Sequence, residues 1–272
     1  MKDYRSTALG VDFSIIRDNA RAIRRALPEK TRLCAVVKAN AYGHGDIECA
    51  RAALDGGASL LAVAFAQEGI KLREHDITAP ILVMGSPEQD AGAGSIEEAV
   101  AYGLTLTAFH SDHLYYIDKF ASETGKQADV HIKVDTGMSR IGIYPSELFT
   151  FVSSLENYRN IRLSGIYTHL SSADSFTRDD EEFTRQQFEA FMEAALPIKV
   201  KCPDIILHAA NSAAALRGIS SLKNAADEAL YPAVLLDMAR VGIALYGAPP
   251  VPTSLPLRQA MRWSTKISMV NS

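Results

Sequence analysis

The segment VHIKVDTGMSR, residues 130–140, carries ionisable side chains at every second position. If it forms a strand, His131, Lys133 and Asp135 share one face and the apolar residues between them share the other, because side chains alternate along a strand. Charged groups on one face of a central strand cost free energy unless they are paired. The pattern therefore indicates either an ion network that stabilises the fold or a group of residues that handles protons in a reaction.

A single lysine closes the apolar run of residues 35–37 in the segment AVVKANAYGHG. An amine held close to an apolar wall is a usable nucleophile or base. Lys38 could instead mark the solvated end of a strand, because its long stem can carry the ammonium to water. The segment alone leaves both interpretations open.

Short apolar runs rich in Val, Ile and Leu recur along the chain, separated by amphipathic segments. Alternating strands and helices favour parallel pairing, because parallel neighbours need a crossover connection. Eight such units in roughly 250 residues have the size of a (β/α)8 barrel. We therefore predict an α/β fold, a (β/α)8 TIM barrel with parallel strands, preceded by a helix over residues 12–27. The predicted strands are residues 33–37, 60–65, 81–84, 105–109, 130–134, 161–167, 205–208 and 234–238.

Residues that could do chemistry fall at or just beyond the ends of five of these strands. They are Lys38 after the first strand, Arg140 after the fifth, His169 after the sixth, Asn211 and Ser212 after the seventh, and Arg240 and Gly242 after the eighth. Barrel enzymes place their catalytic groups at this C-terminal face. The segments NSAAALRG and RVGIALYG also predict a phosphate site there, because N–H groups at a helix N-terminus bind anions.

The chain of 272 residues has 28 Lys and Arg against 32 Asp and Glu, a net charge of −4. We expect no nucleic-acid partner and no membrane contact, because there is no basic excess to neutralise phosphates. The longest wholly apolar stretch, residues 60–66, is far shorter than a membrane span. The polar start MKDYRST lacks the apolar region of a signal peptide, which predicts a cytoplasmic protein. Cys34, Cys49 and Cys202 lack metal-site spacing, so we expect buried reduced thiols and no metal site.

Five segments, taken in order, resemble the motif set of alanine racemases: AVVKANAYGHG, KVDTGMSRIG, YTHLSSAD, HAANSAA and RVGIALYG. The resemblance covers residues 11 to 247. It implies a barrel that carries pyridoxal 5′-phosphate, acts on a small amino acid and interconverts L- and D-alanine. The family's usual proline after the arginine of the last motif is Val241 here, and SSADS varies around the histidine, which leaves details of the cofactor pocket open.

The resemblance assigns three catalytic residues by position. Lys38 would be the Schiff-base lysine and one of two catalytic bases. Arg140 would approach the phenolic oxygen of the cofactor and the substrate carboxylate, and His169 would pack near the cofactor ring. Arg240 would bond the pyridine nitrogen. Because a guanidinium only donates hydrogen bonds, this partner keeps the nitrogen unprotonated and favours return of the proton to Cα.

The same resemblance supplies a set of cofactor-binding residues. They are Lys38, Tyr42, His169, Asn211, Ser212, Arg240, Gly242 and Ile243. Lys133 matches a lysine that is carbamylated in many members of the family. A carbamate would turn Lys133 into an anion able to orient Arg140 through charge-assisted hydrogen bonds.

The second base of the family is a tyrosine from the C-terminal β domain of the partner subunit, and no tyrosine follows Tyr246 here. We divide the chain into a cofactor-binding barrel, residues 1–248, and a Pro-rich linker with the start of a truncated C-terminal β domain, residues 249–272. We expect this chain to bind the cofactor through Lys38 but to racemise poorly. The full-length protein is expected to be a homodimer.

Other functions stay open at this point. They include a non-catalytic barrel that binds pyridoxal phosphate and a racemase for serine or for a broad range of amino acids. An amino-acid decarboxylase of related fold would have an acidic residue where Arg240 stands. A metal-dependent barrel hydrolase that used a carbamylated Lys133 would need several strand-end histidines, and only His169 and His208 are well placed.

Overall fold

Eight parallel strands form a barrel in the computed structural model, which describes residues 7–87, 94–223, 230–267 and 269. Their order follows the chain, and the last strand pairs with the first. Two further hydrogen bonds close the barrel, from Asp237 N to Leu207 O (3.1 Å) and from Arg240 N to Ala210 O (3.1 Å). The predicted (β/α)8 barrel is confirmed. The strands are β2 (Arg32–Val36), β3 (Leu60–Val63), β4 (Ile81–Val83), β5 (Thr105–Ala108), β6 (Ala128–Lys133), β7 (Ile161–Tyr167), β8 (Ile206–His208) and β9 (Met238–Val241).

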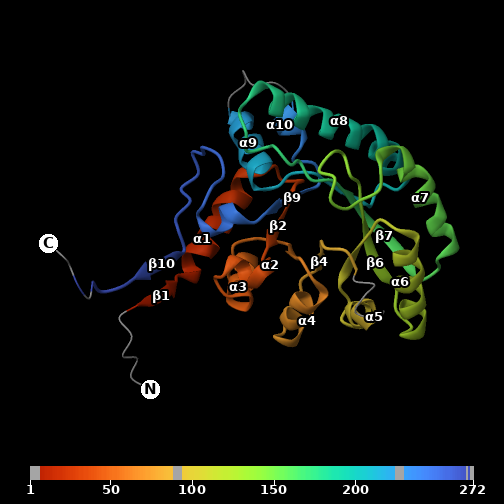
Figure 1. The fold of residues 1–272 in the computed structure, drawn as a ribbon, viewed down its shortest axis with the longest axis horizontal. Coiled ribbons are helices and arrows are strands. Elements are labelled where there is room, and N and C mark those ends of the chain that lie inside the picture. Colours follow the sequence, from red (N-terminus) through yellow and green to blue (C-terminus); the bar gives the residue numbers. More distant parts are fainter. Residues whose placement is uncertain (1–6, 88–93, 224–229, 268, 270–272) are drawn as a thin grey trace.

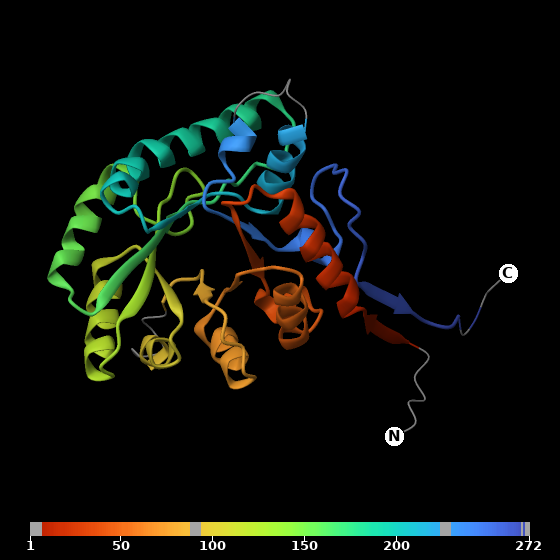
Figure 2. The ribbon, with the colours of Figure 1, turned by 180° about the vertical axis from the view of Figure 1, so that it is seen from behind.

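Helices cover the outside of the barrel (Figure 1; Figure 2). Apolar side chains on the outer faces of the strands pack against them in one continuous core, to which Val130, Ile132 and Val134 contribute with no exposed surface. The α-helices are α1 (Phe13–Ala26), α2 (Lys38–Tyr42), α3 (Asp46–Asp55), α4 (Ala66–Glu74), α5 (Gly94–Ala101), α6 (Ser111–Glu123), α7 (Leu148–Ser154), α8 (Arg178–Lys201), α9 (Ser212–Lys223) and α10 (Leu230–Ala233). Three short 3-10 helices are η1 (Pro145–Glu147), η2 (Leu155–Asn157) and η3 (Ile243–Tyr246).

The interior of the barrel is apolar on one side and polar on the other. The apolar side is a separate cluster from β2, β3, β4 and β9: Cys34, Val36, Leu60, Ala62, Leu82 and Met238. The polar side comes from β5 to β9 and contains the buried side chains of Thr107, His131, Lys133, His208 and Arg240. The alternation that the sequence shows in residues 130–134 therefore separates an outer apolar face from an inner polar face, as predicted.

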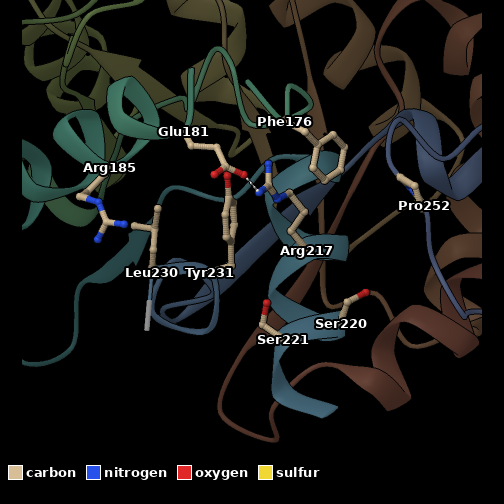
Figure 3. Close-up of a pocket in the computed structure, with 9 residues that line it drawn as sticks. All are labelled: Phe176, Glu181, Arg185, Arg217, Ser220, Ser221, Leu230, Tyr231 and Pro252. Carbon is tan, nitrogen blue, oxygen red and sulfur yellow. Dashed lines mark hydrogen bonds and ion pairs between the residues drawn. The ribbon is translucent and has the colours of Figure 1, made fainter. Parts of the chain in front are cut away.

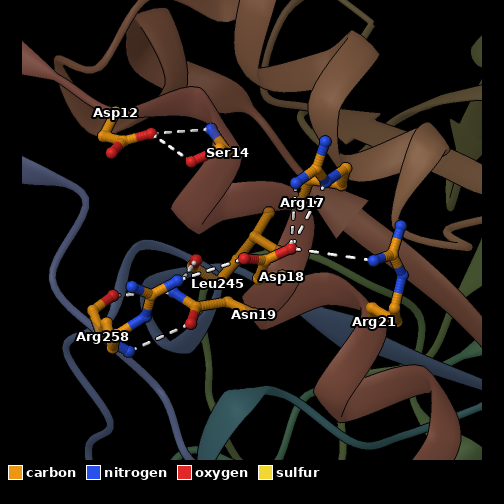
Figure 4. Close-up of polar contacts among 8 residues, drawn as sticks. All are labelled: Asp12, Ser14, Arg17, Asp18, Asn19, Arg21, Leu245 and Arg258. Carbon is orange, nitrogen blue, oxygen red and sulfur yellow. Dashed lines mark hydrogen bonds and ion pairs between the residues drawn. The ribbon is translucent and has the colours of Figure 1, made fainter.

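Helix α1 confirms the helix predicted over residues 12–27 and also anchors the end of the barrel. Its cap is Asp12, whose carboxylate accepts a hydrogen bond from Ser14 N at 2.9 Å. Asn19 is 1% exposed and donates from Nδ2 to Leu245 O (3.0 Å) and Arg258 O (2.8 Å), while its Oδ1 accepts from Arg258 N (3.0 Å) (Figure 4). The Pro-rich segment is therefore held firmly against α1.

A two-stranded antiparallel ribbon lies outside the ring of helices. It pairs β1 (Ala8–Val11) with β10 (Met261–Ser264), close to both ends of the chain (Figure 1). The division of the chain at residue 248 stays a prediction. Within the described ranges, no helix combines the length and the apolar character that crossing a membrane would need.

Two sequence predictions are wrong. The eighth strand is β9 (Met238–Val241) and not residues 234–238. The buried side chains of Val234 and Leu235 belong to the outer core beside α10, whereas the true strand contains Arg240, whose charge hides it from a search for apolar runs. Cys202 is exposed because it directly follows the last residue of α8, while Cys34 and Cys49 are buried as expected.

Candidate active site

A cavity of about 280 Å³ lies at the C-terminal ends of the barrel strands. Most of the residues that the sequence singles out line it, namely Lys38, Tyr42, His169, Asn211, Ser212, Arg240, Gly242 and Ile243. The remaining wall, which the sequence did not predict, is Val36, Met84, Ser171, Asp174, Ala213 and Pro250. The structure thus brings residues from the ends of β2, β7, β8 and β9 into one site.

The short element α2, which begins at Lys38 two residues after the end of β2, is a left-handed turn and not a regular right-handed helix. Residues 39–42 have φ angles of 52° to 53°, although none of them is glycine. A left-handed conformation costs about 1–2 kcal/mol for each such residue. Hydrogen bonds within the turn run from Ala41 N to Val37 O (2.9 Å) and from Gly43 N to Ala39 O (3.1 Å). The turn brings the ring of Tyr42 back to Lys38, whose Nζ lies 6.0 Å from the ring centroid.

The neighbouring part of the cavity wall combines the start of α9 with the residues after β9. The Ser212 hydroxyl accepts a hydrogen bond from Gly242 N at 2.9 Å. Asn211 caps α9, because its Oδ1 accepts from Ala214 N at 3.0 Å. A Cβ on Gly242 would lie 2.5 Å from Tyr42 Oη, so glycine lets the tyrosine hydroxyl approach the backbone. This wall places two hydroxyls beside a helix N-terminus, an arrangement suited to a phosphate.

Arg240 lies at the centre of a buried polar network. Its Nη1 lies 2.8 Å from His208 Nδ1, and its Nη2 donates to Thr168 O (2.9 Å) and Ala209 O (3.2 Å). His208 Nε2 is in turn 2.8 Å from His131 Nδ1. Because a guanidinium only donates, His208 must accept at Nδ1 and donate from Nε2 to His131.

Both histidines of this network are neutral. Burial, assisted by the Arg240 charge, lowers the pKa of His208 well below its usual value. Burial lowers the pKa of His131 to about 4. A neutral relay can lie beside a cation without further repulsion, which is how the barrel interior accommodates the arginine.

Tyr167 completes the network and was not predicted as a site residue. Its ring stacks on His208, with centroids 4.7 Å apart and planes 4° from parallel. Its hydroxyl lies 2.9 Å from Thr107 Oγ1, and burial raises its pKa. A tyrosine at the end of an apolar strand carries no signal of this role in the sequence, because it is also a common strand residue.

Positive charge dominates the mouth of the barrel. Burial and then the nearby cations Arg240, Lys133, Arg140 and Lys38, in that order of effect, together lower the pKa of His169 to about 3. Among the described residues that line the cavity, Asp174 is the only carboxylate. The site is therefore suited to an anionic ligand.

Lys133 and Arg140 are not in the cavity wall that the structure describes. Lys133 is 2% exposed and donates from Nζ to Val134 O at 2.8 Å. Burial, followed by the Arg240 charge, lowers its pKa to about 8. Arg140 is exposed in the loop after β6, and no hydrogen bond among the described residues joins it to Lys133. The described ranges also contain no cluster of three or more His, Cys, Asp or Glu side chains able to hold a metal ion.

A second cavity, of about 520 Å³, lies outside the barrel at α8, α9 and α10 (Figure 3). Arg217 from α9 is its central cation. The guanidinium stacks on the rings of Tyr231 (3.9 Å) and Phe176 (4.5 Å) and donates to Glu181 Oε1 at 2.5 Å. None of the residues that the sequence singles out lies there.

Comparison with known proteins agrees with the motifs. Residues 11–250 match the family model of the alanine racemase N-terminal domain. The alanine racemase of Symbiobacterium thermophilum is 37% identical over 271 residues, which cover 98% of this chain and 66% of the relative. That of Geobacillus stearothermophilus is 39% identical over 259 residues, covering 94% of this chain and 61% of the relative.

Solved structures give the same result. Alanine racemase of Clostridium difficile 630 in complex with cycloserine matches with a TM-score of 0.82 at 30% identity, over 100% of this chain and 71% of that one. The Bacillus anthracis enzyme with bound L-Ala-P matches with a TM-score of 0.79 at 33% identity, over 97% and 64%. The chain spans between 61% and 66% of the length of the two curated relatives, and it belongs to the family of the alanine racemase N-terminal domain.

Proposed function

We propose that this chain is the cofactor-binding barrel of a pyridoxal 5′-phosphate-dependent alanine racemase, in which Lys38 bonds the cofactor. The observation that carries the proposal is Arg240, a buried cation beside the cavity that takes part in none of the ion pairs among the described residues. Membership of the family supports the reaction. The solved relative that holds L-Ala-P supports an alanine-sized substrate.

The residues of the cavity fit this cofactor. The hydroxyls of Tyr42 and Ser212, with the backbone at Gly242 and Ile243, suit its phosphate, and Asn211 fixes the start of α9 beside them. Arg240 has the right chemistry for the pyridine nitrogen, because it is a donor that stays protonated. His169 is neutral and can pack against an aromatic ring.

When bound, pyridoxal phosphate spreads the negative charge that develops at the substrate Cα as its proton leaves. The amine of Lys38 takes or returns this proton on one face of the substrate. Arg240 would hold the pyridine nitrogen as a hydrogen-bond donor and leave it unprotonated, which would favour return of the proton to Cα. Arg140, in the loop after β6, is the residue we assign to the substrate carboxylate.

We propose that Lys133 is carbamylated. A lysine with a pKa of about 8 is partly neutral near physiological pH, and only the neutral amine attacks carbon dioxide. The ammonium first loses one proton to give the neutral amine. The amine nitrogen then forms an N–C bond to carbon dioxide as one C–O π bond breaks, and a second proton leaves the nitrogen, so a buried cation becomes an anion. Burial beside Arg240 favours that change, because opposite charges replace like charges.

We propose further that the full-length protein is a cytoplasmic homodimer. The second proton-transfer group then comes from a tyrosine of the partner's C-terminal domain. These 272 residues span 66% and 61% of two curated relatives, so we expect them by themselves to bind the cofactor but to racemise alanine poorly.

Covalent trapping tests the proposal. The chain is mixed with pyridoxal phosphate, reduced with borohydride and mapped by mass spectrometry. We expect the label on Lys38 in the wild type and in Lys30→Ala, which changes an exposed lysine, and no label at that position in Lys38→Ala. A wild-type chain labelled only at other lysines would refute the assignment.

A further inference from the structure

We propose that Glu68, on α4, positions Lys38 for its reaction with the cofactor by holding the backbone that follows the lysine. The inference rests on the proposed function, because it concerns the lysine assigned to the cofactor. Glu68 is outside the lining of the cavity, and neither its position nor its type marked it in the sequence. We therefore regard it as a positioning residue.

The carboxylate of Glu68 accepts hydrogen bonds from three backbone N–H groups. Its Oε1 accepts from Ala39 N at 2.5 Å. Its Oε2 accepts from Ala64 N at 2.7 Å and from Phe65 N at 3.1 Å. One side chain thus links the residue after Lys38 to the end of β3 and the start of α4.

Two of these bonds have an ordinary structural role. A glutamate in the first turn of a helix commonly reaches back to the N–H groups at its own helix start, which are otherwise unsatisfied. The bonds to Ala64 and Phe65 are of this kind. The bond to Ala39 is different, because that residue lies 29 positions away and belongs to the turn that begins at Lys38. Capping of α4 does not require it.

The turn at Lys38 is the strained part of the site. The left-handed stretch begins at Ala39, whose φ angle is 52°. Such a conformation persists only where the surroundings hold it in place. Glu68 holds the first N–H of the stretch with a carboxylate, and charge-assisted bonds of this kind are shorter and stronger than bonds between neutral groups.

Helix α4 also reaches the turn at Asn40 through a second, indirect contact. Lys71 bonds both carboxylate oxygens of Asp46 at 2.9 Å. Asp46 N in turn donates to Asn40 Oδ1 at 3.1 Å. Helix α4 therefore holds the turn directly through Glu68 at Ala39, next to the reactive lysine, and indirectly through Lys71 and Asp46 at Asn40.

The substitution Glu68→Gln tests this role. It keeps the size of the side chain but replaces one acceptor oxygen with an NH2 group, so three N–H groups face a single acceptor. We expect covalent attachment of pyridoxal phosphate to Lys38, followed as a borohydride-quenched time course, to slow by about tenfold or more, because small misplacements of a reacting group cost this much. Binding of pyridoxine 5′-phosphate, which has an alcohol in place of the aldehyde, should not change.

Two further variants act as controls. Glu68→Asp keeps the charge and can still cap α4, but it is one methylene too short to hold both α4 and Ala39. Glu68→Asp should slow attachment of pyridoxal phosphate to Lys38 with a smaller loss of stability than Glu68→Gln. If Glu68→Gln does not fold, the attachment rate of Glu68→Asp tests the positioning role. Glu48→Gln makes the same chemical change on α3, where the carboxylate is half exposed and paired with Arg51. This variant should match the wild type.

The outcomes separate the two proposals. If pyridoxal phosphate attaches to Lys38 at the wild-type rate in both Glu68 variants, Glu68 does not position the lysine. The label on Lys38 would still support the assignment of the cofactor to this lysine. An equal loss of pyridoxine 5′-phosphate binding also overturns the positioning role, because Glu68 would then support the pocket as a whole. If the wild type carries no label on Lys38, the proposed function fails first and the inference fails with it.

Discussion

Two arginines, the buried Arg240 and the partly buried Arg217, show two ways in which this protein accommodates a cation. Arg217 has 12% of its side chain exposed, pairs with Glu181 and stacks on two aromatic rings. Arg240 is 4% exposed and is bonded to neutral His208 and to backbone carbonyls. A buried charge is expensive unless it is paired, so only the first is fully compensated.

The difference between the two arginines helps to decide which of the two cavities is suited to a ligand. The cavity beside Arg217 is the larger of the two, but both of its arginines already pair with carboxylates, Arg217 with Glu181 and Arg185 with Glu182. The smaller cavity beside Arg240 keeps an uncompensated cation and several hydroxyl and N–H donors. Cavity size favours the cavity beside Arg217, whereas the state of the arginine favours the cavity beside Arg240, to which we assign the cofactor.

Removing each arginine is the strongest test of this contrast. We expect Arg240→Met to raise the dissociation constant for pyridoxine 5′-phosphate about 10- to 100-fold, because a hydrogen bond to a charged group contributes about 1.5–3 kcal/mol. Arg217→Met should leave this affinity unchanged. Fluorescence titration measures both. A loss of affinity in Arg217→Met equal to that in Arg240→Met would break the comparison.

The contacts of Arg217 can also be tested through their contribution to stability. Arg217→Met removes a cation that stacks on Phe176 and Tyr231 and pairs with a half-exposed carboxylate. We expect it to lower the free energy of unfolding by about 2 kcal/mol, chiefly through the lost stacking. Urea unfolding measures the change, with the exposed Arg25→Met as control. An unchanged midpoint would show that the ring contacts contribute little.

The sequence predicts most of the barrel but not the residues that support its site. The predicted strand at residues 60–65 contains β3, whose residues are all buried, because an unbroken apolar run is typical of a buried parallel strand. The eighth strand was misplaced because Arg240 interrupts its pattern. Lys38 and Gly242 carry motif signals, whereas Glu68 and Tyr167 act through contacts with residues distant in the chain, which no local pattern encodes.

The neutral histidine relay gives the Arg240 side a pH dependence that the Arg217 side lacks. The pKa of folded His131 is about 4, below the value of 6.5 for a free histidine. Between these values the unfolded chain binds a proton that the folded chain does not. Stability should therefore fall as pH drops from 6.5 towards 4, on the order of 1 kcal/mol per pH unit for each such histidine.

Urea unfolding at pH 7.5 and pH 5.5 checks this expectation. The loss at the lower pH should be smaller in His131→Asn than in the wild type. His75→Asn, which changes an exposed histidine, should lose as much as the wild type. If the two variants behave alike, the relay is not the source of the acid sensitivity.

Carbamylation of Lys133 would reduce the contrast between the two arginines, because it would give Arg240 an anion nearby in place of a second cation. We expect a ¹³C resonance from a carbamate when the chain is equilibrated with labelled bicarbonate, and none in Lys133→Gln. Bicarbonate should raise the free energy of unfolding of the wild type by about 1 kcal/mol or less, because stabilisation by binding grows only with the logarithm of ligand concentration.

The ¹³C signal of the carbamate should strengthen as pH rises towards 8, where burial has placed the pKa of Lys133 and the neutral amine becomes abundant. The same signal in Lys133→Gln would assign the carbamate to another amine, and Arg240 would then keep an unmatched charge until the cofactor binds.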